Sequence, residues 1–285
     1  MDIEILAKEA QVLQERAKAK AQDWTKLGKA LEALRGEAGW LDPKARKKVF
    51  DLASKLVDGE ASDAGRDLRT FVASAKAGYA ALRPMLRSRL IEGLEERAKK
   101  EGIAFEILGE TPVVLRYGDL SLNLDFEKEL ATWTYAREKL ASCPLVLEQI
   151  LEIRREVLAA LQGSWPGREA FFEALFAAWG AAVGRAGLPP GSRVELVQLL
   201  PEMGVEMQGR GLRKEAAAPS RAEFAFGLDA LARSGGLEAG GKRIELGTAT
   251  GGSTKDKKRV LYLEAGFGGG QYYLTLRFVP AGGGR

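Results

Sequence analysis

The sequence contains no histidine and a single cysteine among its 285 residues. Histidine is the only side chain whose unperturbed pKa suits proton transfer near neutral pH. Its absence excludes Ser-His-Asp triads, Cys-His pairs, and zinc or haem sites with histidine ligands. Cys143 alone forms no intramolecular disulfide, and we expect it to be a small apolar residue between a strand and a helix. An enzyme of this composition would depend on carboxylates with Mg²⁺, a lysine or a tyrosine.

Long apolar runs are also missing. No stretch reaches the ~18 uninterrupted apolar residues of a membrane span, and the segment 1–8 lacks the basic and apolar regions of a secretory signal. We therefore expect a cytoplasmic protein with no membrane contact. An excess of one charge is absent too, because 43 Lys and Arg oppose 39 Asp and Glu. With 46% apolar residues, the chain is expected to fold into one or two domains.

The first segment carries a heptad-like seam. Apolar and small residues recur alternately four and three apart from Leu6 to Leu34, with Lys20 as an interruption. This spacing predicts one long helix with a continuous apolar stripe. Two interpretations of the stripe remain open: packing on the chain's own domain, or association with another protein or a second copy. In the second interpretation, the partner-binding residues are Leu6, Leu13, Trp24, Leu27 and Leu31.

More helices and then a small sheet are predicted in the rest of the first half. Asp42 and Pro43 are typical of a helix start. Two further helices are expected, one capped by Ser62 and one from Met85 to Lys100 that stops at Gly102. The apolar period then changes to two, which predicts an antiparallel sheet with strands at 103–108, 113–117, 120–126 and 131–135.

The second half repeats the order of helices followed by strands. Helices are expected at 145–161 and 167–186, and the second is rich in buried aromatic residues. A loop is expected at 204–219, and Ser220 with Glu223 forms a capping box that opens another helix. The predicted closing strands are 243–246, 259–263 and 271–278.

These patterns predict an α+β protein. We expect an N-terminal helical bundle with a small antiparallel sheet in a domain of residues 1–143. An aromatic-rich helical segment with a C-terminal antiparallel sheet would form a second domain of residues 144–285. The glycine-rich segments 247–255 and 266–270 precede strands rather than helices. They are therefore interpreted as hairpin connections, not phosphate or dinucleotide cradles, and no cofactor is expected.

Three acidic residues in one predicted hairpin are candidates for metal chemistry. Asp125 and Glu127 share a strand face and Asp119 lies nearby, so they could hold Mg²⁺ in a nuclease-like hydrolase. The competing interpretation is a solvated polar face beside a turn. We assign no catalytic or metal-binding residue on this spacing.

Basic clusters are the remaining signal, because Lys and Arg side chains gather at three places along the chain. They could bind phosphate backbones without sequence preference. The candidate nucleic-acid-binding residues are Lys44, Lys47, Lys48, Arg210, Arg213, Lys255, Lys257 and Lys258.

The sequence therefore favours a non-catalytic interaction subunit of a multi-protein assembly. It would associate through its N-terminal amphipathic helix and contact nucleic acid through its basic patches. Two alternatives are a Mg²⁺-dependent carboxylate hydrolase and a nucleic-acid-binding protein that acts alone.

Overall fold

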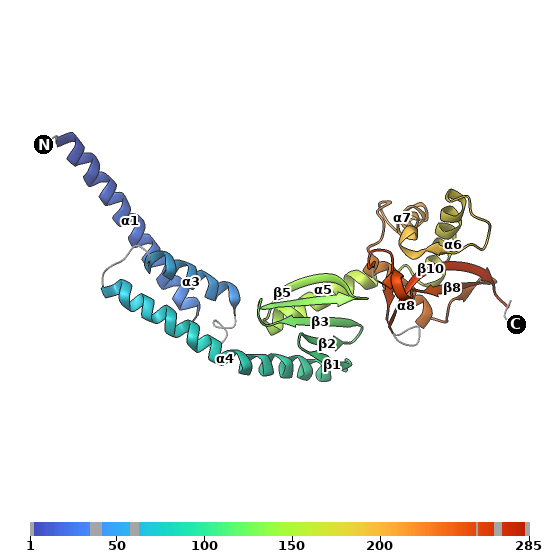
Figure 1. The fold of residues 1–285 in the computed structure, drawn as a ribbon, viewed down its shortest axis with the longest axis horizontal. Helices are drawn as coiled ribbons and strands as arrows, with labels where there is room; N and C mark the ends of the chain where they lie inside the picture. The colour runs from blue at the N-terminus through green and yellow to red at the C-terminus, as the bar shows by residue number, and fades with distance from the viewer. Residues whose placement is uncertain (1–2, 35–41, 58–62, 255, 265–269, 283–285) are drawn as a thin grey trace. The chain divides into compact units, whose positions relative to one another are not determined.

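The computed structural model describes residues 3–34, 42–57, 63–254, 256–264 and 270–282. The chain has the predicted α+β fold: N-terminal helices, a five-stranded antiparallel sheet, further helices and a second antiparallel sheet (Figure 1). It divides into two compact units. The N-terminal unit comprises Met1–Phe105, Leu124–Ala131 and Cys143–Leu151. The C-terminal unit comprises Glu106–Asn123, Thr132–Ser142 and Glu152–Arg285. No helix in the described part of the chain is long and apolar enough to cross a membrane.

Leucine and alanine side chains hold the N-terminal helices together. The helices are α1 (Ile3–Ala33), α3 (Pro43–Val57) and α4 (Asp63–Glu101). The predicted start at Pro43 is confirmed, since the Lys44 amide donates to the Asp42 carboxylate at 2.8 Å. Their shared core consists of Leu27, Ala30, Leu34, Val49, Ala53, Leu56 and Leu68.

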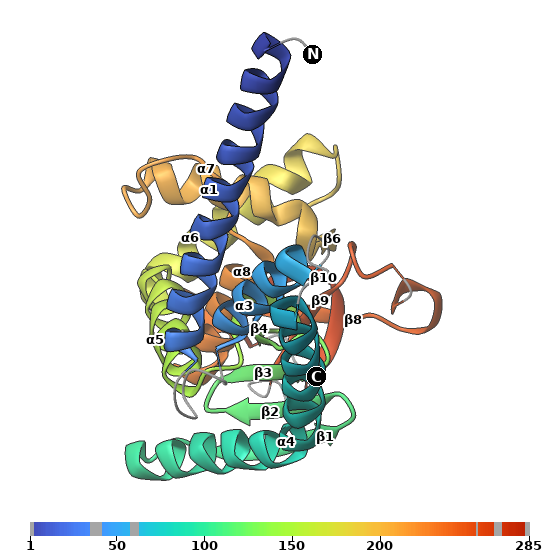
Figure 2. The same cartoon turned by 90° about the vertical axis from the view of Figure 1, so that its left-hand side faces the viewer.

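Helix α4 differs from the prediction. Two helices were expected, one on each side of Pro84, but the structure has one helix of 39 residues with Pro84 inside it. Proline removes one backbone hydrogen bond and crowds the preceding turn, so it bends a helix that neighbouring contacts hold together. Figure 2 shows α4 changing direction along its length.

The first sheet is a meander in which each strand pairs with the next. Alternation in β3 is as predicted, with Leu120, Leu122 and Leu124 buried and the residues between them half-buried. A fifth strand, β5, extends the four that were expected. The strands are β1 (Phe105–Glu110), β2 (Val113–Tyr117), β3 (Leu120–Asp125), β4 (Leu130–Tyr135) and β5 (Glu138–Pro144).

The later helices are α5 (Leu147–Gly163), α6 (Arg168–Arg185), α7 (Leu199–Gly209) and α8 (Arg221–Arg233). The capping box of Ser220 and Glu223 at α8 is confirmed. The loop was predicted to begin at residue 204, and this start is wrong because α7 continues to Gly209. Aromatic side chains of α6 pack on the second sheet, where the Phe176 and Phe278 rings lie 5.0 Å apart.

The second sheet is antiparallel and belongs to the C-terminal unit. Its order is β6-β10-β8-β7, with β9 also paired to β10. In that last pairing, Tyr262 lies directly opposite Tyr272, so the two rings share one face of the sheet. The strands are β6 (Val194–Glu195), β7 (Glu238–Ala239), β8 (Lys242–Thr248), β9 (Leu261–Leu263) and β10 (Gln271–Pro280), and short 3-10 turns lie at Leu196–Gln198 and Gly251–Thr254.

Candidate nucleic-acid interface

A strained two-residue turn in the C-terminal unit presents an arginine. Ala136 (φ 50°) and Arg137 (φ 63°) join β4 to β5. A two-residue hairpin favours this left-handed conformation, but it usually has Asn or Gly there, because other residues lose about 1–2 kcal/mol in it. Arg137 is exposed at this turn. Strain at a non-glycine residue of this kind is typical of functional positions.

Two tyrosine rings and a lysine surround Arg137. Its guanidinium lies 4.1 Å from the centre of the Tyr262 ring and donates to the Tyr272 hydroxyl at 3.1 Å. The Lys257 ammonium donates to the same hydroxyl at 2.8 Å. Lys258 follows in the chain and is exposed. We call Arg137, Lys257, Lys258, Tyr262 and Tyr272 the cationic–aromatic cluster.

Arg221, at the start of α8, holds the segment that carries these lysines. Its guanidinium donates to the carbonyls of Lys257 and Lys258 at 3.0 Å each, and also to the carbonyl of Val260. The same side chain pairs with Glu138 at 2.6 Å. Because the planar guanidinium has five donors in a fixed arrangement, one residue fixes a whole stretch of backbone.

The cluster borders a groove of about 530 Å³ with a positive lining. Among the described residues that line it, the only carboxylate is Glu138, which is already paired with Arg221. Burial raises the pKa of the Tyr272 hydroxyl, but hydrogen bonds from Lys257 and Arg137 outweigh this and leave the pKa below its usual value. The site therefore stabilises negative charge on an oxygen atom.

The predicted basic cluster at the start of α3 forms a second groove, in the N-terminal unit. Lys44, Lys47 and Lys48 line about 540 Å³ together with Lys26 and Lys29 of α1. Asp51 also lines this groove, where it pairs with Lys47 at 2.6 Å. We call the groove lined by these five lysines the lysine groove.

The other predicted basic residues are not gathered in this way. Arg210 pairs with Glu173 and Arg213 pairs with Glu223, each at 2.9 Å. Their charges are thereby balanced within the C-terminal unit. Lys255 lies outside the described residues.

The predicted partner-binding seam is used partly by the chain itself. Leu27 is 2% exposed in the core shared by α1, α3 and α4, and Trp24 and Leu31 are packed against that core. The side chains of Leu6 and Leu13 lie outside the described part of α1.

The three candidate metal ligands have other partners. Asp119 accepts a hydrogen bond from Arg233 at 2.9 Å, and Glu127 lies 3.3 Å from Arg83. Asp125 accepts from the Lys128 amide at 3.0 Å, which is a turn-capping arrangement. No group of three or more acidic or cysteine side chains in the described part of the chain is placed to hold a metal ion.

Sequence reasoning missed Arg137, Arg221 and Tyr262. Arg137 occupies a turn that has none of the usual Asn-Gly or Asp-Gly signals. Arg221 acts on backbone carbonyls more than 35 positions away in the chain, at Lys257 and Lys258. The one available signal was the alternation around 261–263 and 271–273, which places Tyr262 and Tyr272 on one face once the register is known.

Comparison with known proteins identifies no relative: no family model, curated protein or solved structure matches the chain.

Proposed function

We propose that this protein is a non-catalytic subunit of a multi-protein assembly and that it contacts nucleic acid through the cationic–aromatic cluster. The observation that carries the proposal is the groove in which Arg137, Lys257 and Lys258 lie together while its one described carboxylate is paired with Arg221. Cations held close together without bound carboxylates match the phosphates of a nucleic-acid backbone.

The contacts favour phosphates over bases. Arg137 and Lys257 lie over the tyrosine rings, with the ammonium 4.2 Å from the centre of the Tyr272 ring. The rings therefore position the cations and are not open platforms for stacking bases. Stacking reduces the side-chain freedom that a cation loses when it binds phosphate. The expected binding is independent of base sequence.

The lysine groove supports a second contact with the same chemistry. Its five lysines outnumber the one acidic residue in its lining. Lysine side chains on two helices are mobile point charges, so we expect this groove to add salt-sensitive affinity without selectivity.

The assembly role rests on the first half of α1. Figure 1 shows this half extending beyond α3 and α4 within the N-terminal unit, and Val12 on it is 45% exposed. The heptad-like stripe that the sequence predicts for this half is suited to a partner helix. The partner would be another protein or a second copy.

Fluorescence anisotropy with labelled oligonucleotides tests the nucleic-acid contact. We expect the logarithm of affinity to fall linearly with the logarithm of salt concentration. The variants Arg137→Gln and Lys257→Gln should each make that slope shallower by about 0.7 for a single strand or about 0.9 for a duplex. Arg259→Gln is the matched control, since it removes the same charge from a side chain that is paired with Glu195. A flat salt dependence, or equal effects of all three variants, would contradict the proposal.

Light scattering on the full chain tests association separately. The double variant Leu6→Asp with Leu13→Asp should dissociate a homo-oligomer or release a co-purifying partner. The exposed pair Gln11→Asp with Gln14→Asp adds the same charge beside the seam and should change neither. If the wild-type chain is a monomer and purifies without a partner, the assembly role is wrong while the nucleic-acid contact stands.

A further inference from the structure

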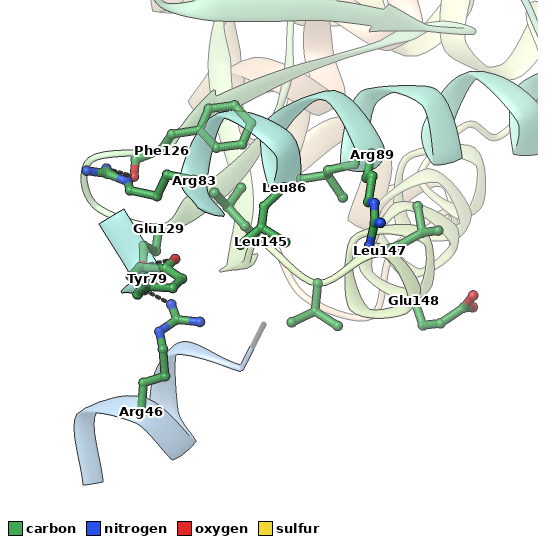
Figure 3. Close-up of a pocket in the computed structure, with 12 residues that line it drawn as sticks. Arg46, Tyr79, Arg83, Leu86, Arg89, Phe126, Glu129, Leu145, Leu147 and Glu148 are labelled. Atoms are coloured by element: carbon green, nitrogen blue, oxygen red, sulfur yellow. Dashed lines mark hydrogen bonds and ion pairs between the residues drawn. The ribbon is translucent and has the colours of Figure 1, made fainter. Parts of the chain in front are cut away.

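The cations of the cationic–aromatic cluster differ from a buried arginine of the N-terminal unit in the group to which they bond. In a pocket of about 360 Å³ lined partly by α4, Arg46 pairs with the carboxylate of Glu129 (Figure 3). In the C-terminal unit, Arg137 and Lys257 instead donate to the Tyr272 hydroxyl, at 3.1 Å and 2.8 Å. A hydroxyl is neutral, so these bonds position the two cations without neutralising them.

The two cations converge on one point. Both contact the same oxygen atom, and both lie over the same ring, with Arg137 5.1 Å and Lys257 4.2 Å from the centre of the Tyr272 ring. Because both donor nitrogens are within hydrogen-bond distance of one atom, they are at most about 6 Å apart. A single phosphate group can accept hydrogen bonds from both cations, whereas cations spread along a line match successive phosphates.

The backbone on both sides of this point is fixed within the C-terminal unit. Arg137 occupies the left-handed turn with a φ of 63°. Lys257 belongs to the segment whose carbonyls accept from Arg221, at 3.0 Å for Lys257 and for Lys258. The two cations therefore approach each other without a ligand, and a ligand that binds between them loses less affinity to the ordering of side chains.

The environment of the Tyr272 hydroxyl favours negative charge at this point. Burial alone would raise the pKa of Tyr272, but the hydrogen bonds from Lys257 and Arg137 leave the pKa below its usual value. A terminal phosphate carries a charge of about −1.5 to −2 at pH 7 and three strong acceptor oxygens. An internal phosphate of a strand carries only one negative charge. Two converging cations therefore match a terminal phosphate better than an internal one.

We propose that the cationic–aromatic cluster binds the phosphorylated end of a nucleic-acid strand, with the terminal phosphate between Arg137 and Lys257 and the next phosphate beside Lys258. This proposal rests on the nucleic-acid contact proposed above and adds the part of the strand that is recognised. Lys258 favours a strand over an isolated phosphate group or a phosphopeptide, because it is exposed, follows Lys257 in the chain and lines the same groove. The second phosphate that it would contact is present only in a strand.

Competition measured by fluorescence anisotropy tests the recognition of a strand end. An internally labelled oligonucleotide with both ends phosphorylated is displaced from the full chain by unlabelled oligonucleotides of one sequence, which carry a 5′-phosphate, a 3′-phosphate or two hydroxyl ends. A phosphate at one of the two ends should improve competition by about tenfold, because charge-assisted hydrogen bonds are added. AMP should likewise compete about tenfold better than cyclic AMP, whose phosphate is a diester of the same nucleoside.

Two variants keep the charge of the cluster and remove its convergence. Tyr272→Phe removes the oxygen that both cations contact, and Arg137→Lys replaces the planar fork of donors by a single ammonium group. Each should abolish the tenfold preference for a phosphorylated end, while the dependence of affinity on salt stays as in the wild type because the number of cations is the same. Tyr273→Phe is the matched control. It removes a hydroxyl bonded to Gln271 from a side chain that is 5% exposed, and it should keep the preference.

The outcomes separate this proposal from the one on which it rests. Salt-dependent binding with equal competition by all three oligonucleotides would overturn end recognition and leave the nucleic-acid contact standing. A flat salt dependence would contradict both. A phosphoserine peptide that competes as well as the phosphorylated oligonucleotide would show a general phosphate site and overturn the recognition of a strand. A preference that persists in both Tyr272→Phe and Arg137→Lys would place the terminal phosphate elsewhere and overturn the proposal.

Discussion

Each of the two units contains an arginine stacked on a tyrosine, and the difference between the two places is a carboxylate. In the N-terminal unit, Arg46 lies over Tyr79 and pairs with Glu129, and all its charge is buried. In the C-terminal unit, Arg137 lies over Tyr262 and is exposed, and no described carboxylate pairs with it. The same stacking therefore stabilises the fold in one unit and leaves a positioned positive charge for a ligand in the other.

The C-terminal unit also shows the opposite case, a buried carboxylate without a cation bonded to it. Asp229 is 2% exposed and accepts from the Tyr135 hydroxyl at 2.6 Å and the Glu264 amide at 3.2 Å. Its other carboxylate oxygen has no hydrogen-bond partner in the described part of the chain. Burial outweighs these bonds and raises the pKa of Asp229 to about 6. Both Glu129 and Asp229 accept a hydrogen bond from a tyrosine hydroxyl. The difference between them is that Glu129 also pairs with a cation, Arg46.

The largest effect on stability should come from removing the carboxylate that balances the charge of Arg46 in the N-terminal unit. Glu129→Gln leaves the buried Arg46 guanidinium without its carboxylate, and breaking a buried ion pair costs about 3–5 kcal/mol. We expect the midpoint of urea unfolding, followed by circular dichroism of the helices, to fall accordingly. Tyr79→Phe keeps the ion pair and should cost only about 1 kcal/mol. Equal losses in both variants would mean that the ion pair does not dominate.

Asp229→Asn should instead raise the free energy of unfolding above that of wild type at neutral pH. The folded pKa of about 6 exceeds the unfolded value of 3.8, so the folded state binds the proton more tightly. Stability from this group is complete below the unfolded pKa and is lost as pH rises through 6. The gap corresponds to about 3 kcal/mol. The advantage of Asp229→Asn over wild type in unfolding free energy should therefore grow by about 3 kcal/mol between pH 4 and pH 8.

A companion variant checks the cause of that pH dependence. Tyr135→Phe removes a hydrogen bond that lowers the pKa of Asp229, so the stability loss should extend to higher pH than in wild type. Urea titrations over a pH series measure both variants. A pH profile identical to wild type for Asp229→Asn would show that Asp229 does not control it.

These contrasts also show which features local sequence can predict. Helix starts at Pro43 and Ser220 and the alternation of 120–125 depend on neighbours within four residues, and each is confirmed. Pro84 is a strong local signal for a helix end. Nevertheless α4 continues through Pro84 as one helix, and a local signal of this kind can be outweighed by tertiary packing.

The candidate sites were less predictable because their residues are far apart in the chain. Lys257 and Lys258 were identified from charge alone, but their groove requires Arg137 and Arg221, more than 35 positions away. The sequence indicated only part of the lysine groove, since Lys44, Lys47 and Lys48 lie within five residues on one helix while Lys26 and Lys29 come from another. Whether a cation is balanced depends on such long-range partners, which periodicity does not reveal.

The smallest effect on stability should come from Arg137→Gly. This variant tests most directly whether the charge of Arg137 supports the fold or binds a ligand. Glycine adopts a φ of 63° without strain, so the variant should be more stable than wild type by about 1 kcal/mol. It should also lose the Arg137 share of nucleic-acid affinity, with a shallower salt slope than wild type. Thermal unfolding and anisotropy on the same samples measure the two quantities. Arg137→Asn provides a second αL-tolerant side chain without the charge. If both variants lose stability, Arg137 supports the fold as Arg46 does, and the contrast between the two units fails.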